Sequence, residues 1–178
     1  MAYNKLNVLH WHLTDAHSFP FVSEREPLMA AYGTYSAGQM YRPDDIRRIV
    51  HHATVRGVKV VPELDAPAHV GSGWEWGESR GLGQLVLCAR EEAWAEYCGS
   101  PPCGFLNPIN ENVYRVLGNI YKDMAELFHS DIFHMGGDEV DSKCWQHTPE
   151  VVVCLPHSRF PILNRFELIP ADSSCIWL

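Results

Sequence analysis

Three short apolar segments alternate with two amphipathic segments along the chain, and this order constrains the fold more than any other feature. The segments KLNVLHWHL (5–13), VKVVPEL (58–64) and DIFHMGG (131–137) have the composition of β-strands. Apolar residues recur at helical spacing in the segments 43–57 and 110–128 that separate the strands. This alternation of strand and helix predicts an α/β fold with a parallel sheet.

Acidic or histidine residues follow each predicted strand at its carboxyl end. Asp15 follows the first strand, Asp65 and His69 follow the second, and Asp138 and Glu139 follow the third. Catalytic groups at the carboxyl ends of successive parallel strands are typical of a (β/α)₈ barrel or of a doubly wound sheet. No glycine-rich nucleotide-binding sequence follows any of these strands, so we favour the barrel.

The composition is that of an ordinary globular domain. The chain has 178 residues, of which 46% are hydrophobic and 20% charged, and its formal net charge is -8. This acidic balance, without a basic run, disfavours binding to nucleic acid or to an anionic membrane. No apolar stretch reaches the length of a transmembrane helix.

A long loop is expected over 71–109. Its Trp74 and Trp94 are candidate platforms for stacking a sugar ring, and ordinary packing is equally open for each of them. Cys98 and Cys103 bracket Gly-Ser-Pro-Pro, which predicts a stapled loop rather than a zinc knuckle, because no second close pair follows. Six cysteines allow fifteen pairings and favour the secretory pathway, in a lysosomal or extracellular location. The first residues nevertheless show no signal-peptide pattern.

His10 and His12 share one face of the first strand, because side chains on a strand alternate between its faces. Together with His69 they are candidate metal ligands, which leaves a metal-dependent hydrolase as an alternative function. The interpretation that we favour is a packed, hydrogen-bonded pair that lines the barrel, because the spacing alone is a weak signal.

Asp138 and Glu139 are adjacent, so a regular strand would point them to opposite faces. Gly136 and Gly137 precede them and permit unusual backbone dihedrals, which could turn both acids toward one cleft. Two acids at an apolar strand end are costly unless they are solvated, paired or catalytic. Because acids also end the other strands, we favour a catalytic role over a merely solvated strand end.

Three motifs resemble the β-N-acetylhexosaminidases of glycoside hydrolase family 20, and most closely those of arthropods. They are NVLHWHLTD at 7–15, VVPELDAPAHVGSGW at 60–74 and FHMGGDEV at 133–140, supported by PPCGFLNP at 101–108. The resemblance implies a partial (β/α)₈ TIM-type barrel that contains about the second to the fourth of eight strands.

The expected domain organisation follows the extent of this resemblance. Residues 1–150 form the partial catalytic barrel, and 151–178 form an atypical C-terminal tail that does not match the family. We expect this tail to be a truncated or mis-spliced end.

The resemblance also implies roles for the site residues. Glu139 matches the general acid, and Asp138 matches the residue that orients the 2-acetamido group of the substrate, whose own oxygen attacks the anomeric carbon. His69 and Asp15 match residues that are linked to the acid through hydrogen bonds. The residues expected to contact the substrate are Trp94, Trp74 and His12.

The implied activity is exo-hydrolysis of terminal non-reducing β-linked N-acetylhexosamine, with retention of configuration and without a metal or cofactor. The expected partner is a β-N-acetylhexosaminide glycan, and a homodimer is expected for the full-length form. N-glycans and chitin oligosaccharides both stay open as substrates. A catalytically inactive or sugar-binding fragment is the second alternative.

Overall fold

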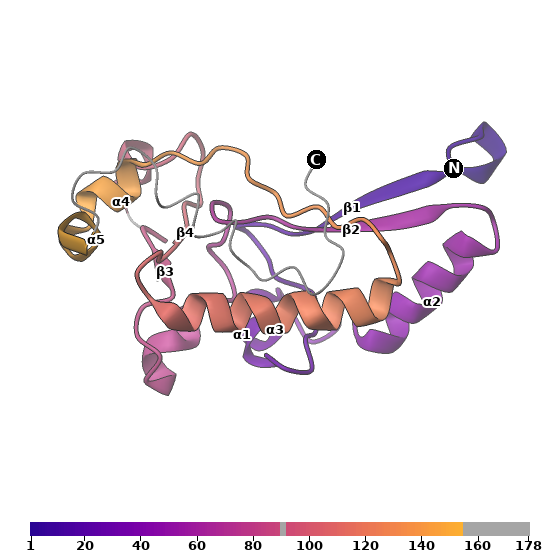
Figure 1. Ribbon diagram of the computed structural model, residues 1–178, viewed down its shortest axis with the longest axis horizontal. Helices are drawn as coiled ribbons and strands as arrows, with labels where there is room; N and C mark the ends of the chain where they lie inside the picture. The colour runs from indigo at the N-terminus through magenta and orange to yellow at the C-terminus, as the bar shows by residue number, and fades with distance from the viewer. Residues whose placement is uncertain (90–91, 155–178) are drawn as a thin grey trace.

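Two parallel strands covered by helices form the centre of the protein, as the alternating pattern predicts. The computed structural model describes residues 1–89 and 92–154. Strand β1 (Val8–Thr14) pairs in parallel with strand β2 (Lys59–Leu64). Figure 1 shows the two strands side by side, with helices α2 (Pro43–Thr54) and α3 (Glu111–Phe128) below them.

Both long helices begin and end at the signals that their sequences carry. Pro43 takes the first position of α2, and the Asp45 side chain accepts a hydrogen bond from the backbone N–H of Arg42. The side chain of Asn110 caps α3 by accepting from the N–H of Asn112. The inward-facing stripe of α3 is apolar apart from one aspartate, which explains why the helix packs on the sheet; its buried residues are Val113, Val116, Leu117, Ile120, Asp123, Met124, Leu127 and Phe128.

The sheet has one face toward the helices and one polar face. Trp11 of β1 points to the helices, where its ring packs edge-on against Tyr41 and Phe128. His10 and His12 point the other way, as the period of two predicts, and both lie near the Glu63 carboxylate on β2. The structure therefore confirms that the two histidines share a face.

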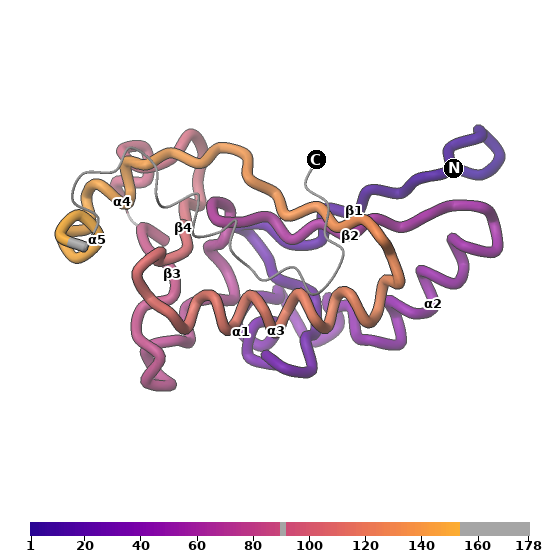
Figure 2. Tube along the Cα trace, in the orientation of Figure 1, coloured from indigo at the N-terminus to yellow at the C-terminus, as the bar shows by residue number. Residues whose placement is uncertain are grey.

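The third predicted strand, 131–137, is shorter than expected. It runs parallel beside β2 in Figure 2, but within the described residues a single isolated bridge, from His134 to Glu63, is all the strand pairing that it makes. The backbone N–H of His134 donates to the carbonyl of Pro62 at 3.0 Å, and Leu64 N–H donates back to His134 at 3.2 Å. The positive φ angles of Gly136 and Gly137 end the extended conformation, so the expected strand is wrong except around His134.

The predicted loops contain short elements that the sequence pattern did not indicate. A two-residue antiparallel pair and two 3₁₀ turns lie inside the long loop over 71–109, and a short helix lies in the loop before α2. Two further helices follow the third strand-like segment. These elements are η1 (Ala2–Asn4), α1 (Leu28–Gly33), η2 (Glu75–Arg80), β3 (Val86–Leu87), η3 (Trp94–Glu96), β4 (Phe105–Leu106), α4 (Lys143–His147) and α5 (Pro149–Cys154).

Two disulfides hold the loop region. Cys98 pairs with Cys103, which confirms the predicted stapled loop. Cys88 pairs with Cys144 across a sequence separation of 56 residues, and so ties the long loop to α4. Most of the tail predicted over 151–178 lies outside the described residues.

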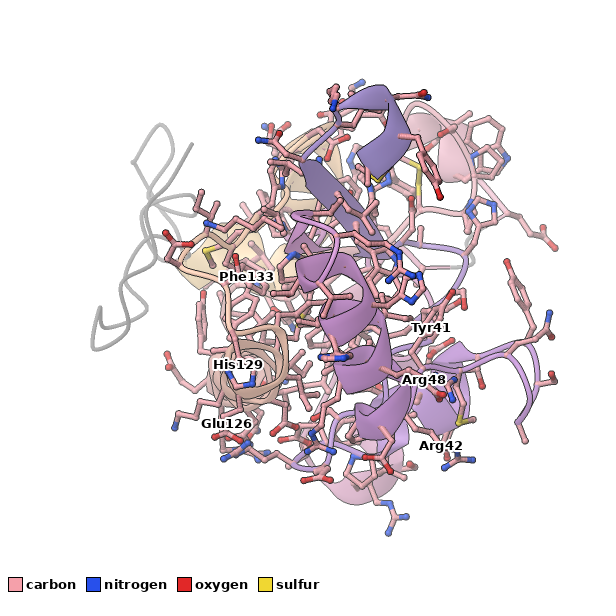
Figure 3. The ribbon with its side chains drawn as sticks, turned by 90° about the vertical axis from the view of Figure 1, so that its right-hand side faces the viewer. Tyr41, Arg42, Arg48, Glu126, His129 and Phe133 are labelled. Atoms are coloured by element: carbon pink, nitrogen blue, oxygen red, sulfur yellow. A yellow bond between two sulfur atoms is a disulfide. The ribbon has the colours of Figure 1, made fainter. Side chains whose placement is uncertain are left out.

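The opposite end of the strands, away from these disulfides, carries the ends of the helices. Figure 3 looks onto this end, where α2 crosses the front and His129 stands at the end of α3. Phe133 lies just beyond that helix end and packs edge-on against Tyr121. Within the described residues, no helix combines the length and the apolar character that crossing a bilayer requires.

Candidate active site

Asp15, His69 and Glu139 lie in a row where the three parallel segments end. The Nδ1 atom of His69 is 3.5 Å from Asp15 Oδ1, and its Nε2 atom is 3.3 Å from Glu139 Oε2. Asp138 Oδ2 is 3.9 Å from the same Nε2 atom. The imidazole therefore stands between the carboxylate of one segment and the acidic pair of another.

The Nε2 atom of His69 is buried and has no hydrogen-bond partner within the described part of the chain. The side chain is 21% exposed, whereas those of Asp138 and Glu139 are 66% and 57% exposed. A buried nitrogen without a partner is costly, and the Glu139 carboxylate is near enough to become its hydrogen-bond partner after a small movement.

The backbone around the acidic pair breaks the alternation of a strand. Gly136 and Gly137 have φ angles of 72° and 111°, and Glu139 itself has a φ of 50°. With these left-handed conformations in the segment, both acids lie near His69 Nε2. For a residue other than glycine this conformation costs on the order of 1 kcal/mol or more, and such strain concentrates at functional sites.

Gly136 packs so closely on Asp65 that no other residue fits. A Cβ atom at Gly136 would lie 2.6 Å from the Cα atom of Asp65. The side chain of Asp65 is 1% exposed, and its Oδ1 atom accepts from the N–H of Gly137 at 3.3 Å. Burial raises the pKa of the Asp65 carboxyl to about 7 against the attraction of His69, and the nearby Asp138 adds to the rise.

Replacing Asp65 by Asn is expected to flatten the pH dependence of stability. The ordinary pKa of 3.8 is raised to about 7 in the folded chain, so between these values only the folded state holds the proton. The free energy of unfolding therefore falls as pH rises through this range, and Asn removes that slope. Urea unfolding of the 178-residue chain from pH 4 to pH 8 measures it, with exposed Asp44→Asn as the control. Equal slopes in the wild type and Asp65→Asn would contradict the assignment.

A second polar cluster surrounds Glu63, whose side chain is only 5% exposed. His10 Nε2 lies 2.5 Å from Glu63 Oε2, His134 Nδ1 lies 3.1 Å from Oε1, and His12 Nδ1 lies 3.6 Å from Oε2. Within the described residues, no lysine or arginine comes within ion-pair distance of this carboxylate. Among the described residues, the neighbours of this buried carboxylate at ion-pair distance are imidazoles.

His12 links the two clusters. Its Nε2 atom lies 3.5 Å from Asp15 Oδ2 and 3.7 Å from Asp65 Oδ2, while Nδ1 faces Glu63. The side chain is 42% exposed. The structure thus brings His12 to the edge of the acidic site that the sequence predicts.

Within the described part of the chain, three groups of side chains have the geometry to hold a metal ion, with possible ligand atoms within 4.8 Å of one another. The groups are His10 with Glu63 and His134, His12 with Glu63 and Asp65, and Asp65 with His69 and Asp138. The alternative zinc ligands His10, His12 and His69 fall into three different groups and do not form one ligand set. In the first group the ligand atoms are already in contact with one another. The separation of His10, His12 and His69 into different groups argues against a metal-dependent hydrolase that uses all three.

The two tryptophans predicted to contact substrate lie in different surroundings. Trp74 is 1% exposed and packs edge-on against Phe19, so burial argues against its use as a stacking platform. Trp94 is partly exposed in η3, and its carbonyl accepts from the N–H of Cys98 inside the stapled loop. Trp94 is therefore partly accessible while its backbone is held.

Sequence reasoning missed Glu63 and His134 as members of the polar network, and it noted Asp65 only as a strand end. The period of two carries the missing signal for β2, because Glu63 and Asp65 alternate onto the same face as His10 and His12. His134 had a weaker signal: it is a polar residue between the apolar residues Phe133 and Met135, two positions before Gly136.

The parallel strands, the covering helices and the acids at the strand ends define part of a TIM-barrel-type domain. The chain matches the family profile described as "Glycosyl hydrolase family 20, catalytic domain" over residues 1–165. It belongs to this family.

Relatives from insects are among the most similar. The chain is 47% identical over 146 residues to the "Probable beta-hexosaminidase fdl" of Drosophila melanogaster, covering 82% of this chain and 22% of that protein. It is 44% identical over 178 residues to the "Chitooligosaccharidolytic beta-N-acetylglucosaminidase" of Bombyx mori, covering 99% of this chain and 28% of that protein.

A solved relative is the Flavobacterium johnsoniae chitobiase, with a TM-score of 0.69 and 29% identity. The superposition covers 86% of this chain and 22% of that chain. The chain thus spans between 22% and 28% of the length of these curated relatives and this solved structure.

Proposed function

We propose that this chain supplies the acid and the acetamido-orienting residues of an exo-acting β-N-acetylhexosaminidase. The substrate is a terminal non-reducing β-linked N-acetylhexosamine on a glycan or a chitin oligosaccharide. The observation that carries the proposal is the row of Asp15, His69 and Glu139, with Asp138 beside the same imidazole nitrogen. Membership of the family and the names of the insect relatives support it.

Glu139 acts as general acid and later as general base. In the first step its carboxyl protonates the glycosidic oxygen as the sugar leaves, and in the second it takes a proton from water. Asp15 holds His69 through Nδ1, so that Nε2 faces Glu139 and adjusts its proton affinity through the cycle. His69 lies 3.5 Å from Asp15 and 3.3 Å from Glu139. Both contacts can shorten to hydrogen bonds once the substrate closes the site.

Asp138 orients the 2-acetamido group and stabilises positive charge on the cyclised intermediate. The acetamido oxygen attacks the anomeric carbon as the bond to the leaving oxygen breaks, and water later opens the ring. Both displacements occur at the same carbon, so the product keeps the β configuration. Adjacent residues can serve both tasks because the Gly136–Gly137 turn releases them from strand alternation.

Further features of the whole protein are part of the proposal. The β1, β2 and 131–137 segments correspond to about the second, third and fourth of eight barrel strands. Two disulfides support a protein of the secretory pathway, lysosomal or extracellular. Trp94 and His12 line the sugar site, and a homodimer stays a prediction for the full-length form.

The test is a complete-barrel form, in which residues 1–150 replace the matching segment of the Bombyx mori relative. We expect it to hydrolyse an aryl N-acetyl-β-glucosaminide and to release the β-anomer first, as observed by proton NMR during the reaction. Circular dichroism checks that the protein is folded. A folded form without turnover, or one that releases the α-anomer, would contradict the proposed function.

Sugar binding without turnover is the second candidate for the 178-residue chain by itself. Asp138 and Glu139 are more than half exposed, so in this chain water surrounds the groups that catalysis needs in a dry site. Calorimetric binding of N-acetylglucosamine by the chain, with turnover only in the complete-barrel form, would support this candidate.

A further inference from the structure

The cluster around Glu63 is a polar network, centred on a buried carboxylate, that the proposed catalytic steps do not use. Its carboxylate is 5% exposed and contacts imidazoles from two different segments, His10 on β1 and His134 beside β2. The rings of His10 and His134 also lie against each other, with their centroids 4.8 Å apart. A buried carboxylate is costly unless polar groups surround it, and here the imidazoles are those groups.

His134 Nδ1 has two polar neighbours of opposite kind. It lies 3.1 Å from Glu63 Oε1, which can only accept when ionised, and it accepts the backbone N–H of Gly136 at 3.1 Å. One ring nitrogen cannot donate and accept at once. When Nδ1 carries no proton it holds Gly136, and when it is protonated it turns to Glu63 and leaves the Gly136 N–H without its acceptor.

Gly136 is the first residue of the turn that aims the acids. Its φ of 72° is the first of three left-handed conformations in this turn, followed by those of Gly137 and of Glu139, whose φ is 50°. Two backbone N–H groups of this turn donate to side chains: Gly136 to His134 and Gly137 to Asp65. The imidazole of His134 therefore supplies one of the two side-chain acceptors that hold the backbone at the two glycines.

The neighbouring residue fixes which way His134 points. Phe133 faces the helices and packs edge-on against Tyr121 at a centroid distance of 5.2 Å. Because adjacent side chains of an extended segment alternate, His134 faces the polar side, toward Glu63. The ring is thus anchored from both sides, with its backbone in the bridge to β2 and its side chain in the cluster.

We propose that His134 is a positioning residue for Glu139: by accepting the Gly136 N–H it sets the turn from which the acid reaches the leaving oxygen. The inference rests on the proposed function for its consequence in catalysis, while the contact itself is independent of any activity. The Glu63 carboxylate competes with Gly136 for Nδ1. A displacement of about 1 Å in a reacting group can cost about 10²-fold in rate.

The contact is tested by hydrogen–deuterium exchange of the 178-residue chain, read on peptides that contain Gly136. His134→Ala removes the acceptor and is expected to speed exchange at Gly136. His134→Asn places an amide oxygen near the position of Nδ1 and should restore the slower exchange. His51→Ala, at an exposed histidine of α2, is the control and should match the wild type. Equal exchange in the wild type and His134→Ala would overturn the proposal.

The catalytic consequence is tested in the complete-barrel form with two leaving groups. For a chitobiose-type substrate, which needs the acid, His134→Ala should lower kcat about 10²-fold and leave KM unchanged. For a 2,4-dinitrophenyl glycoside, which leaves without a proton, the loss should be much smaller. His134→Asn should regain most of the rate with the poor leaving group.

The outcomes distinguish a failure of the positioning role of His134 from a failure of the proposed function. Equal losses of kcat for both leaving groups would give His134 only a general structural role and overturn its assignment as a positioning residue. A kcat of His134→Asn no higher than that of His134→Ala on the chitobiose-type substrate would also overturn this assignment. Absence of hydrolysis by the folded wild-type form would instead refute the proposed function, and the exchange experiment would still decide whether His134 holds Gly136.

Discussion

Replacing Glu139 by Gln in the complete-barrel form is expected to lower kcat by about 10²–10⁴-fold on a chitobiose-type substrate. Gln keeps the shape of the side chain but cannot give a proton to the leaving oxygen. It also removes the carboxyl group that faces His69 Nε2 at 3.3 Å. His69 then keeps its contact with Asp15 but no longer faces a carboxylate at residue 139. Steady-state rates at several pH values measure the loss and show whether the basic limb of the profile disappears.

The choice of leaving group separates acid catalysis from general damage. A 2,4-dinitrophenyl glycoside needs little protonation, so its first step should survive in Glu139→Gln. Glu24→Gln is a matched control, because Glu24 is an exposed acid outside the site. Wild-type kcat on the chitobiose-type substrate in Glu139→Gln would remove this residue from the role of acid.

The helices and the polar face of the sheet could be predicted because local signals determine them. Pro43 and the acids behind it mark the start of α2, and the apolar stripe of the segment 110–128 marks α3. The period of two placed His10 and His12 on one face. The glycines before Asp138 indicated that this backbone would depart from a strand.

Features that depend on distant partners could not be predicted in the same way. The segment 131–137 has a strand-like composition, but it pairs with β2 only at His134. A β-ladder forms only where a partner strand lies alongside, and the β-propensity of a segment does not show this. The burial of Glu63 arises from residues of three segments that are far apart in the sequence. Trp74 was a candidate for stacking because no local pattern distinguishes a ring buried against Phe19 from an exposed one.

The candidate site, like the fold, has features that local sequence signals predict and features that depend on distant partners. The types of residue at the strand ends predicted that Asp15, His69 and Glu139 would meet, since parallel strands bring their carboxyl ends to one edge. The raised pKa of Asp65 had no counterpart in the sequence, because it results from burial beneath the Gly136–Gly137 turn. Charge and spacing locate acids, whereas tertiary packing decides which of them keep a proton.

The 2-acetamido group of the substrate is expected to be indispensable. In the proposed mechanism its oxygen is the nucleophile, and Asp138 only orients it, beside the nitrogen of His69 that also faces Glu139. A well-placed intramolecular nucleophile has an effective molarity of about 10⁵–10⁸ M, so removing it should lower kcat/KM at least about 10³-fold. The rival mechanism uses Asp138 itself as the nucleophile, and it would cleave a sugar with or without the acetamido group.

The measurement compares an aryl N-acetyl-β-glucosaminide with the otherwise identical β-glucoside in the complete-barrel form. Asp138→Asn supplies a second comparison. If the carboxylate stabilises the cyclised intermediate, the variant should have a lower kcat/KM on the N-acetyl-β-glucosaminide. Its kcat/KM on the β-glucoside, which cannot form that intermediate, should change little. Mass spectrometry of protein quenched during turnover looks for a glycosyl ester, because covalent catalysis by Asp138 would leave the sugar attached. Similar kcat/KM values for the two substrates, or an ester on Asp138, would replace substrate assistance by direct nucleophilic attack.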